Sequence, residues 1–574
     1  MKKLLLSGFI LLFLALSVQG VLGAQESSVA SNSSHISEAP LNPEFIEYHN
    51  TSQRLERVNN VNFERSLGLV PEPVDSSYLK GKKVSKKALV AEMQGIADVS
   101  AVDLEDILSA PATYDLRTLG RVSSVKNQGA CGSCWAFATY GSMESTALPG
   151  QMFDFSENNL KNAHGFDYGS CEGGTSGMST AYLARWGGPV AEGDDPYVAS
   201  STTSPTNLPV QEHAQEILLI PGRSGPLDND NIKAALQTTG ALDTSIYWSS
   251  TYYNTSSRAY FYNVTSGHNH AVTIVGWDDT YSKNNFNPVA PGNGAFIIKN
   301  SWGTSWGDYG YFHQSYYDTS VGKILTAFTG ESATNYNHIY QYDPLGRTQN
   351  FGYKNFLGFG DDTAWAANVF TSTSAESLKA VGFYTNQVDT TYQVFIYTNP
   401  DQGPISSAGP VSTVQGTIGI PGYHTIVLPS PVSLNAGQKF SIVIRFQTPN
   451  YFYPIAVELP ISGYSSKATA SAGQSYTSST GSIWTDLSAQ YPNTNVCLKA
   501  YTVNKPPVAT FSATPTSGMV PLDVQFNDTS TGGTPTMWNW SFGDNSWFNT
   551  SQASQRNTSH IYTSNGTYTD YLTV

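Results

Sequence analysis

Three residue types in this chain could act together in nucleophilic catalysis. Cys134 ends the short segment Cys-Gly-Ser-Cys, and His270 and Asn300 follow it far downstream. A thiol attacks a carbonyl carbon only as the thiolate, and a free cysteine with a pKa of about 8.5 is mostly protonated at neutral pH. A neighbouring imidazole and the N-terminus of a helix both lower that pKa. The sequence therefore predicts a cysteine nucleophile with a histidine base.

The residues that follow Cys134 predict the helix that this chemistry needs. Residues 134–148 are rich in alanine, aromatic residues, Leu and Met, and Pro149 ends the run. Cys134 would lie in the first turn, where free N–H groups and the helix dipole stabilise an anion. Gly129 and Gly132 would let the preceding loop turn tightly against a substrate backbone.

The segments around these residues resemble papain-like cysteine peptidases. The resemblance covers Gln128 through Phe137, the strand-like run 270–277 that begins with His270, and Lys-Asn-Ser-Trp-Gly at 299–303. The separation from Cys134 to His270 lies within the family's usual interval of about 130–150 residues, whereas Asn300 lies beyond it. We attribute the excess to residues 278–294, which are rich in turn formers and predict a long loop.

The resemblance implies a role for each of these residues. Cys134 would attack, His270 would form the thiolate–imidazolium pair and then protonate the leaving amine, and Asn300 would orient the imidazole. The Gln128 side chain and the Cys134 backbone N–H would form the oxyanion hole, in which one donor is worth about 2.7–4 kcal/mol. Trp302 would cover the hydrogen bond between Asn300 and His270.

Each residue also has an ordinary alternative, but the combination favours an active site. A single cysteine is usually a small buried hydrophobe, and a single histidine is usually part of a core or a surface. His268 competes with His270 as the base, because residues two positions apart on a strand point to the same face of the sheet. The Ala-Val that follows His270 favours His270.

The resemblance also implies a disulfide and a substrate-binding edge. Cys171, in Ser-Cys-Glu-Gly-Gly, would bridge to Cys131, and Gly173 and Gly174 would pair with an extended peptide by strand addition. The chain has 4 cysteines, and Cys497 remains as a predicted buried free thiol.

Two polar segments bear on specificity and on metals. Thr175-Ser176 and His268-Asn269 fall where relatives shape the main specificity pocket, and they are more polar than a hydrophobic pocket requires. The acidic run 228–237 lacks the glycine and terminal Glu of a calcium loop, so we predict a capped short helix there. No metal and no cofactor are expected, and the predicted substrates are proteins or peptides.

The N-terminus predicts export. Lys2-Lys3, an apolar run to Val18 and a small-residue segment are typical of a signal peptide at 1–23, although an uncleaved anchor stays open. The apolar run is short for a membrane span, and no later transmembrane segment is expected. Low charge, 13%, fits an extracellular or cell-surface chain, and the net charge of −14 argues against nucleic acid as a partner. Sequons compatible with glycosylation occur at Asn32, Asn50, Asn254, Asn263, Asn527, Asn539, Asn549, Asn557 and Asn565.

Residues 24–110 are predicted to be a propeptide or N-terminal extension. They show no helical propeptide pattern of the kind typical of many relatives, so the mode of inhibition stays open. Residues 111–117 resemble the start of mature papain-like enzymes, which predicts a zymogen cleaved near Ala110.

The rest of the chain predicts two β domains behind an α+β papain-like domain at 111–330. That domain would have a helical half to about residue 200 and then a β half, with the cleft between them. Residues 335–503 alternate with period two, which favours a β-sandwich or jelly roll, and are similar to the lectin-like domain of some prokaryotic surface proteins, with cell-surface glycans as a candidate ligand. Residues 507–574 follow a stiff Pro-Pro linker and resemble a PKD domain, an immunoglobulin-like sandwich. The sequence ends within its expected last strand, so we expect the domain to be truncated.

Two alternative functions stay open at this point. The first is a surface adhesion or carbohydrate-binding protein whose peptidase-like region is a non-catalytic scaffold. The second is a transferase that uses the same thioester chemistry for peptide ligation or transglutamination. Gln128 and Asn300 in their peptidase-like segments favour hydrolysis. The sequence therefore predicts a secreted papain-like cysteine endopeptidase with two accessory β-sandwich domains.

Overall fold

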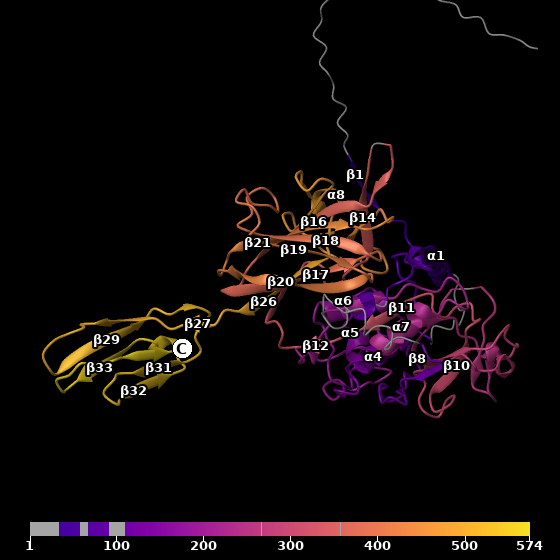
Figure 1. Cartoon of the computed structure of the whole chain (residues 1–574), viewed down its shortest axis with the longest axis horizontal. Helices are drawn as coiled ribbons and strands as arrows, with labels where there is room; N and C mark the ends of the chain where they lie inside the picture. The colour runs from indigo at the N-terminus through magenta and orange to yellow at the C-terminus, as the bar shows by residue number, and fades with distance from the viewer. Residues whose placement is uncertain (1–33, 58–66, 86, 91–109, 266, 356) are drawn as a thin grey trace, which may run out of the picture.

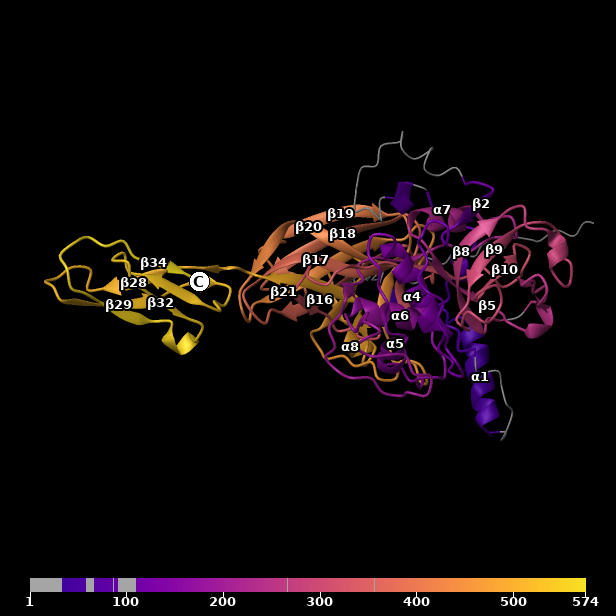
Figure 2. The same ribbon diagram turned by 90° about the horizontal axis from the view of Figure 1, so that it is seen from below.

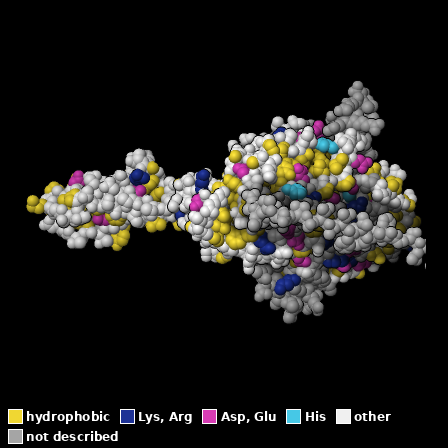
Figure 3. Space-filling view, turned by 90° about the horizontal axis from the view of Figure 1, so that it is seen from above, with side chains coloured by type: hydrophobic (Ala, Val, Ile, Leu, Met, Phe, Trp, Pro, Cys, Tyr) yellow, Lys and Arg dark blue, Asp and Glu magenta, His cyan; other side chains and the backbone are white. Residues whose placement is uncertain are grey.

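The computed structural model describes residues 34–57, 67–85, 87–90, 110–265, 267–355 and 357–574, without the side chains of 52–57. The predicted signal peptide lies outside the described residues. Figure 1 shows a first, two-lobed domain and a middle β domain packed together, with a small C-terminal β domain standing apart. Figure 3 shows the narrow neck that joins this last domain to the rest.

The first lobe of the first domain is helical. Its central helix is α4 (Cys134–Ala147), as predicted, and most of its side chains are buried. Two shorter helices pack beside it, α5 (Glu157–Ala163) and α6 (Ser176–Ala184). Ser156 caps α5 by accepting a hydrogen bond from an amide in its first turn, and Thr175 caps α6 in the same way.

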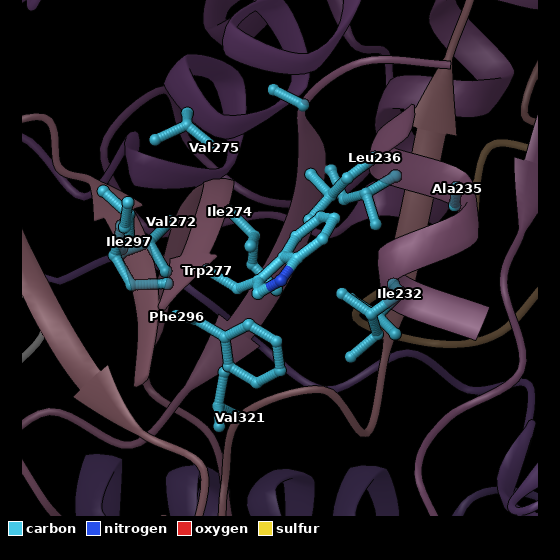
Figure 4. Packing of buried hydrophobic residues seen from close by; sticks show 14 of the residues in the cluster. Ile232, Ala235, Leu236, Val272, Ile274, Val275, Trp277, Phe296, Ile297 and Val321 are labelled. Carbon is cyan, nitrogen blue, oxygen red and sulfur yellow. The ribbon is translucent and has the colours of Figure 1, made fainter. Parts of the chain in front are cut away.

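The second lobe is an antiparallel sheet. Its strands are β5 (Leu242–Ile246), β8 (His270–Asp278), β9 (Ala295–Lys299) and β10 (Tyr311–Ser315), and β2 (Thr113–Asp115) lies along β8. The turn-rich segment predicted as a long loop connects β8 to β9. Trp277 is fully buried at the centre of the core in Figure 4, among Ile274, Phe296 and side chains of helix α7 (Asp230–Thr238).

The sheet of the first domain continues without a break into the middle domain. Strand β4 (Ile217–Leu219) pairs on one side with β11 (Leu325–Phe328) and on the other with β20 (Gly422–Leu434). The resulting sheet has 13 strands among the described residues. The sequence did not predict this, because period-two alternation identifies buried faces and not which edges meet.

The middle domain is a β-sandwich. Strands β17 (Glu376–Thr385), β20 and β26 (Leu498–Asn504) belong to the shared sheet. They face a six-stranded sheet that contains β16 (Thr363–Thr371), β18 (Thr390–Thr398) and β21 (Lys439–Gln447). Cys497 is buried and free, as predicted.

The C-terminal domain is a smaller sandwich of two three-stranded sheets. One contains β28 (Phe511–Thr514), β29 (Leu522–Asp528) and β33 (Thr558–Tyr562), and the other β31 (Trp538–Ser541), β32 (Trp547–Thr550) and β34 (Tyr571–Thr573). Phe526, Trp538 and Trp540 form its core. The predicted fold class, an α+β two-lobed domain followed by two β-sandwiches, is confirmed.

The N-terminal extension contains a strand and a helix, although its sequence does not show the helical propeptide pattern typical of many relatives. Strand β1 (His35–Glu38) pairs with β14 (Gln349–Lys354) of the middle domain, and α1 (Pro43–Arg57) projects from the body in Figure 2. The polar composition of α1 hides its helical period, because Phe45 is the only buried side chain among its described residues 43–51.

The predicted side-chain cap of the helix at 228–237 is also wrong. The Asn229 side chain makes no capping hydrogen bond to α7. Asp228 instead accepts from Ser224 and pairs with Lys83 of the extension. Asp228 therefore binds Ser224 and Lys83 of the extension, and no side chain caps α7 at its N-cap position.

Gly422→Ala tests the junction between the two domains. A Cβ at this position would lie 2.1 Å from the carbonyl oxygen of Ile217, so β20 would have to move away from β4. We expect the free energy of unfolding to fall by about 2 kcal/mol or more, measured by the midpoint of thermal unfolding. Gly193→Ala is the control, because open space surrounds its Cβ. An unchanged midpoint for Gly422→Ala would contradict the pairing.

Candidate active site

Cys134 lies where the helical lobe meets the sheet. It is the first residue of α4, and its Sγ accepts a hydrogen bond from the backbone N–H of Ala271 on β8 at 3.3 Å. Ser133, the N-cap residue, makes no side-chain cap to the helix. The first-turn amides of α4 therefore remain directed toward the sulfur and its surroundings, where they favour negative charge.

His270 is held by one ring nitrogen and covered by an indole. Its Nε2 lies 2.9 Å from Asn300 Oδ1, and its ring stacks on Trp302 with 4.9 Å between centroids. Since an amide oxygen only accepts, Nε2 carries the proton in the neutral ring. The other nitrogen, Nδ1, is buried without a hydrogen-bond partner among the described residues, so it is the nitrogen available to take a proton.

The Gln128 amide is oriented by its neighbours. Its Oε1 accepts from Ser301 Oγ at 2.6 Å, so the amide nitrogen must face the other way. That Nε2 donates to the carbonyl oxygen of Cys131 at 2.9 Å and to that of Leu67 at 3.4 Å. A substrate carbonyl in the place of the Leu67 carbonyl would meet the same donor.

A disulfide and a glycine shape the wall beside the nucleophile. Cys131 and Cys171 are bonded, which ties the loop before α4 to the segment that carries Gly173 and Gly174. A Cβ on Gly174 would lie 2.3 Å from the Trp135 ring, so only glycine lets this backbone lie flat on the indole. Its amide and carbonyl thus remain available to a peptide in the cleft.

The cleft is filled by the N-terminal extension. Val70 donates its backbone N–H to the Gly174 carbonyl at 3.2 Å, and Gly174 donates to the Gly68 carbonyl at 3.1 Å. Leu69 donates its backbone N–H to the Asn269 carbonyl at 3.3 Å and forms a parallel β-bridge with Gly174. The backbone pairing expected for a substrate is thus made by the chain itself.

Gly68 passes directly over the nucleophile loop. A Cβ at this position would lie 2.1 Å from the carbonyl carbon of Gly132, and its φ is +91°. Gly68 is therefore the position at which the extension is least able to carry a side chain.

Burial under the extension keeps the cysteine and the histidine neutral. Desolvation raises the pKa of Cys134 to about 12, although the Ala271 N–H opposes the shift. Desolvation lowers the pKa of His270 to about 4, and the hydrogen bond that Nε2 donates to Asn300 Oδ1 and a backbone contact of Leu67 oppose this shift. A thiolate–imidazolium pair therefore requires solvent, and hence an open cleft.

The structure separates His268 from the catalytic geometry. Its Nδ1 lies 3.4 Å from Glu44 on α1, and its Nε2 lies 3.2 Å from the Ser320 carbonyl. The hydrogen bond with His268 lowers the pKa of Glu44. His268 therefore contacts the extension, whereas His270 alone lies beside Asn300.

Sequence reasoning missed several residues of the site. Ser301, which orients Gln128, is adjacent to Asn300 and could have been suspected from its position. Ala271 contributes only a backbone amide, and Leu67 lies far away in the sequence, so nothing in their types identifies them. No group of three or more His, Cys, Asp or Glu suited to a metal occurs in the described parts of the chain.

Comparison with known proteins agrees with this geometry. The profile of the papain family cysteine proteases matches residues 110–326, a lectin-like domain profile matches 339–502, and a PKD domain profile matches 504–574. Mouse cathepsin K is 30% identical over 273 residues, which span 45% of this chain and 78% of that protein. The viral cathepsin of Choristoneura fumiferana defective polyhedrosis virus is 36% identical over 211 residues, which span 35% of this chain and 58% of that protein.

A solved structure shares both large domains. The cysteine protease and lectin-like domains of Cwp84, a surface layer associated protein of Clostridium difficile, superpose with a TM-score of 0.64 at 25% identity. The match covers 82% of this chain and 98% of that one. The chain belongs to the papain family of cysteine peptidases. It carries a lectin-like domain and a PKD domain behind the peptidase domain. None of its described helices is long and apolar enough to cross a bilayer.

The unprocessed protein should resist thiol alkylation. With a pKa of about 12, roughly one Cys134 in 10⁵ is ionised at pH 7, and the sulfur is buried. We expect iodoacetamide to modify Cys134 at least about 100-fold more slowly than a free cysteine, measured by peptide mass spectrometry. The same measurement in denaturant is the control, and rapid alkylation of the native precursor would contradict the blocked cleft.

Proposed function

We propose that this protein is the secreted precursor of an endopeptidase that hydrolyses peptide bonds with Cys134, His270, Asn300 and Gln128. The observation that carries the proposal is the placement of a carbonyl, that of Leu67, within reach of Gln128 Nε2 in the cleft beside Cys134. An internal stretch of the chain occupies the cleft, which supports cleavage within chains rather than at their ends.

The reaction follows from these contacts. The Cys134 thiolate attacks the scissile carbonyl carbon, and a C–S bond forms while the oxygen gains negative charge beside Gln128 Nε2 and the Cys134 amide. His270, protonated at Nδ1, gives this proton to the leaving nitrogen as the C–N bond breaks. His270 then takes a proton from a water molecule as the water oxygen bonds to the thioester carbon. The C–S bond breaks, the acid leaves, and the thiolate of Cys134 and the imidazolium of His270 are restored.

Neighbouring groups keep the base in position for both proton transfers. Asn300 holds Nε2, which leaves Nδ1 to exchange protons with Cys134 and the substrate. Trp302, stacked on the His270 ring, would shield the Asn300–His270 hydrogen bond from water. Gly173 and Gly174 would bind the substrate backbone. The segment that now pairs with Gly174 supports this role.

The extension is proposed to be a propeptide held by both large domains. Besides β1 on β14, Phe45 packs edge-on against Tyr464 of the lectin-like domain with 5.7 Å between ring centroids. On the other side of the cleft segment, Tyr78 stacks on Tyr451 at 4.0 Å. The inhibitory segment is thus anchored on both sides by non-covalent contacts, and cleavage near Ala110 would break neither of them.

Export and retention at a surface complete the proposal. A disulfide suits an oxidising compartment, and Cwp84 is associated with a surface layer. We propose that the lectin-like and PKD domains hold the enzyme at the cell surface, with glycans as the ligand of the former. Binding of the Cys134→Ala protein to a polysaccharide array would test this role, and its absence from every glycan would contradict it.

Substitution of the two histidines distinguishes the base from its neighbour. Cys134→Ala and His270→Ala should each lower kcat by roughly 10⁴-fold or more, and Asn300→Ala by roughly 10²-fold, because it only orients the ring. His268→Ala should leave kcat within about tenfold, since its contacts are with the extension. The kcat of all four variants is measured by peptide hydrolysis with the processed protein. Loss of activity in His268→Ala, with activity kept in His270→Ala, would overturn the assignment of His270 as the base.

Gly68→Ala in the precursor tests the blocked cleft. The added methyl group cannot fit over Gly132, so the segment should lift and Cys134 should react at least about tenfold faster with an epoxide that alkylates thiolates. Lys80→Ala, an exposed change in the same extension, is the matched control. Equal labelling of both variants and the parent would count against inhibition by this segment.

A further inference from the structure

Two aromatic side chains of the PKD domain point into solvent from the same sheet. Trp547 on β32 is 79% exposed, and Tyr571 on β34 is 63% exposed. Single exposed aromatic residues are common on protein surfaces. The inner face of this sheet, however, already supplies the core with Trp538 and Trp540. The packing of the domain therefore gives no reason for the two exposed rings.

The strand register places both rings in one row across the sheet. Ser541 on the central strand β31 is paired with Trp547 on one side and with Tyr571 on the other. Neighbouring strands lie about 4.8 Å apart, so the two rings extend from backbone positions about 10 Å apart. Successive side chains of a strand point to opposite faces, and Phe548 and Leu572, the next residues along, pack on the core.

The neighbouring row on this outer face is polar and uncharged. Asn539 on β31 is paired with Asn549 on β32 and with Thr573 on β34. Together with Ser541, the two rows hold two aromatic rings, two amides and two aliphatic hydroxyl groups. None of these side chains carries a charge, although the chain as a whole has a formal net charge of −14. A neutral ligand would therefore desolvate no charged group on this face.

The other sheet of the same domain has a different outer face. The exposed side chains of its central strand β29 are Asp523, Gln525 and Asn527, and β33 exposes Ile561. Each Phe and Tyr among the described residues of β28, β29 and β33 packs on the core instead. The exposed row of two aromatic rings is thus specific to one face of the domain.

A neutral sugar chain matches the two rows. A pyranose ring carries C–H groups on its faces and hydroxyl groups around its rim. The faces pack on aromatic rings, and the rim exchanges hydrogen bonds with amides and hydroxyls. Trp547 and Tyr571 would each stack on one sugar ring of a chain, while Asn539 and Asn549 bind its hydroxyl groups. The domain stands apart from the two large domains in Figure 2, so a long chain can lie across this face.

We propose that Trp547, Tyr571, Asn539 and Asn549 form a binding site for a neutral polysaccharide whose pyranose rings follow one another in an extended chain. This inference deepens the proposed retention of the enzyme at a surface and rests on it, because it names a ligand class for the PKD domain. The site uses none of the catalytic residues. It is also separate from any glycan site of the lectin-like domain.

Soluble hexasaccharides test the site in the full-length Cys134→Ala protein, made in cells that attach no N-glycans. Cellohexaose and chitohexaose are the neutral probes, a heparin hexasaccharide is the charged probe, and calorimetry measures each Kd. We expect a neutral probe to bind, and Trp547→Ala and Tyr571→Ala each to raise its Kd roughly tenfold, because each variant removes one stacked ring. Tyr571→Phe keeps the ring and should stay within about threefold of the parent.

Ile561→Ala is the matched control, because it removes an exposed apolar side chain from the opposite sheet of the same domain. Its Kd should stay within about twofold of the parent value. Equal midpoints of thermal unfolding in all variants separate a lost contact from a lost fold. Failure of both neutral probes to bind, or tighter binding of the heparin probe, would overturn the proposal. So would an unchanged Kd in both alanine variants of the ring residues, which would assign the sugar to the lectin-like domain.

Three further results distinguish other occupants and the peptidase itself. Asn539 and Asn549 lie in sequons, and a glycan attached to either in the protein from its native cells would cover the face and overturn the proposal. A concentration-dependent dimer that Trp547→Ala abolishes, without sugar binding, would assign the face to a second copy of the chain. Peptide hydrolysis is measured separately on the processed parent protein. Its absence, with sugar binding intact, would overturn the proposed peptidase activity and leave this site supported.

Discussion

The backbone pairing of β4 with β20 is the constraint on which the rest of the molecule depends. It joins the sheets of the peptidase and lectin-like domains, and side chains reinforce it on both sides. His424 lies 2.6 Å from Glu216, and Trp186 of the peptidase domain stacks on Tyr501 of the lectin-like domain with 5.5 Å between ring centroids. Because the junction is a continuous sheet rather than a linker, it holds the lectin-like domain in a fixed position against the peptidase domain.

The extension uses this fixed geometry. It runs from the lectin-like domain across the cleft and back. It is therefore held by contacts with both domains, which the shared sheet keeps together. In the cleft it makes the main-chain pairs of a substrate while its bulk excludes water. The same cysteine and histidine that need solvent to ionise are thereby held neutral. Under the proposed function, the inhibited and the active enzyme differ in whether water reaches this site.

Some of this was accessible from sequence and some was not. The neighbours of Cys134, His270 and Asn300 are local motifs, so the helix that begins at Cys134 and the strand that begins at His270 could be predicted. Contacts that depend on tertiary placement could not. Phe45 anchors α1 without a helical pattern, and β4 of the peptidase domain pairs with β20 of the lectin-like domain. Strand alternation reports buried faces and gives no information about which domain covers them.

Hydrogen exchange of individual amides, before and after removal of the extension, tests the central claim most directly. The Leu219 amide, bonded to the Pro421 carbonyl, reports the domain junction, and the Gly174 amide, bonded to Gly68, reports the blocked cleft. A fixed two-domain body with a removable blocker predicts that Gly174 loses protection while Leu219 keeps it. Joint loss of protection at both amides, or retention at Gly174, would contradict the account.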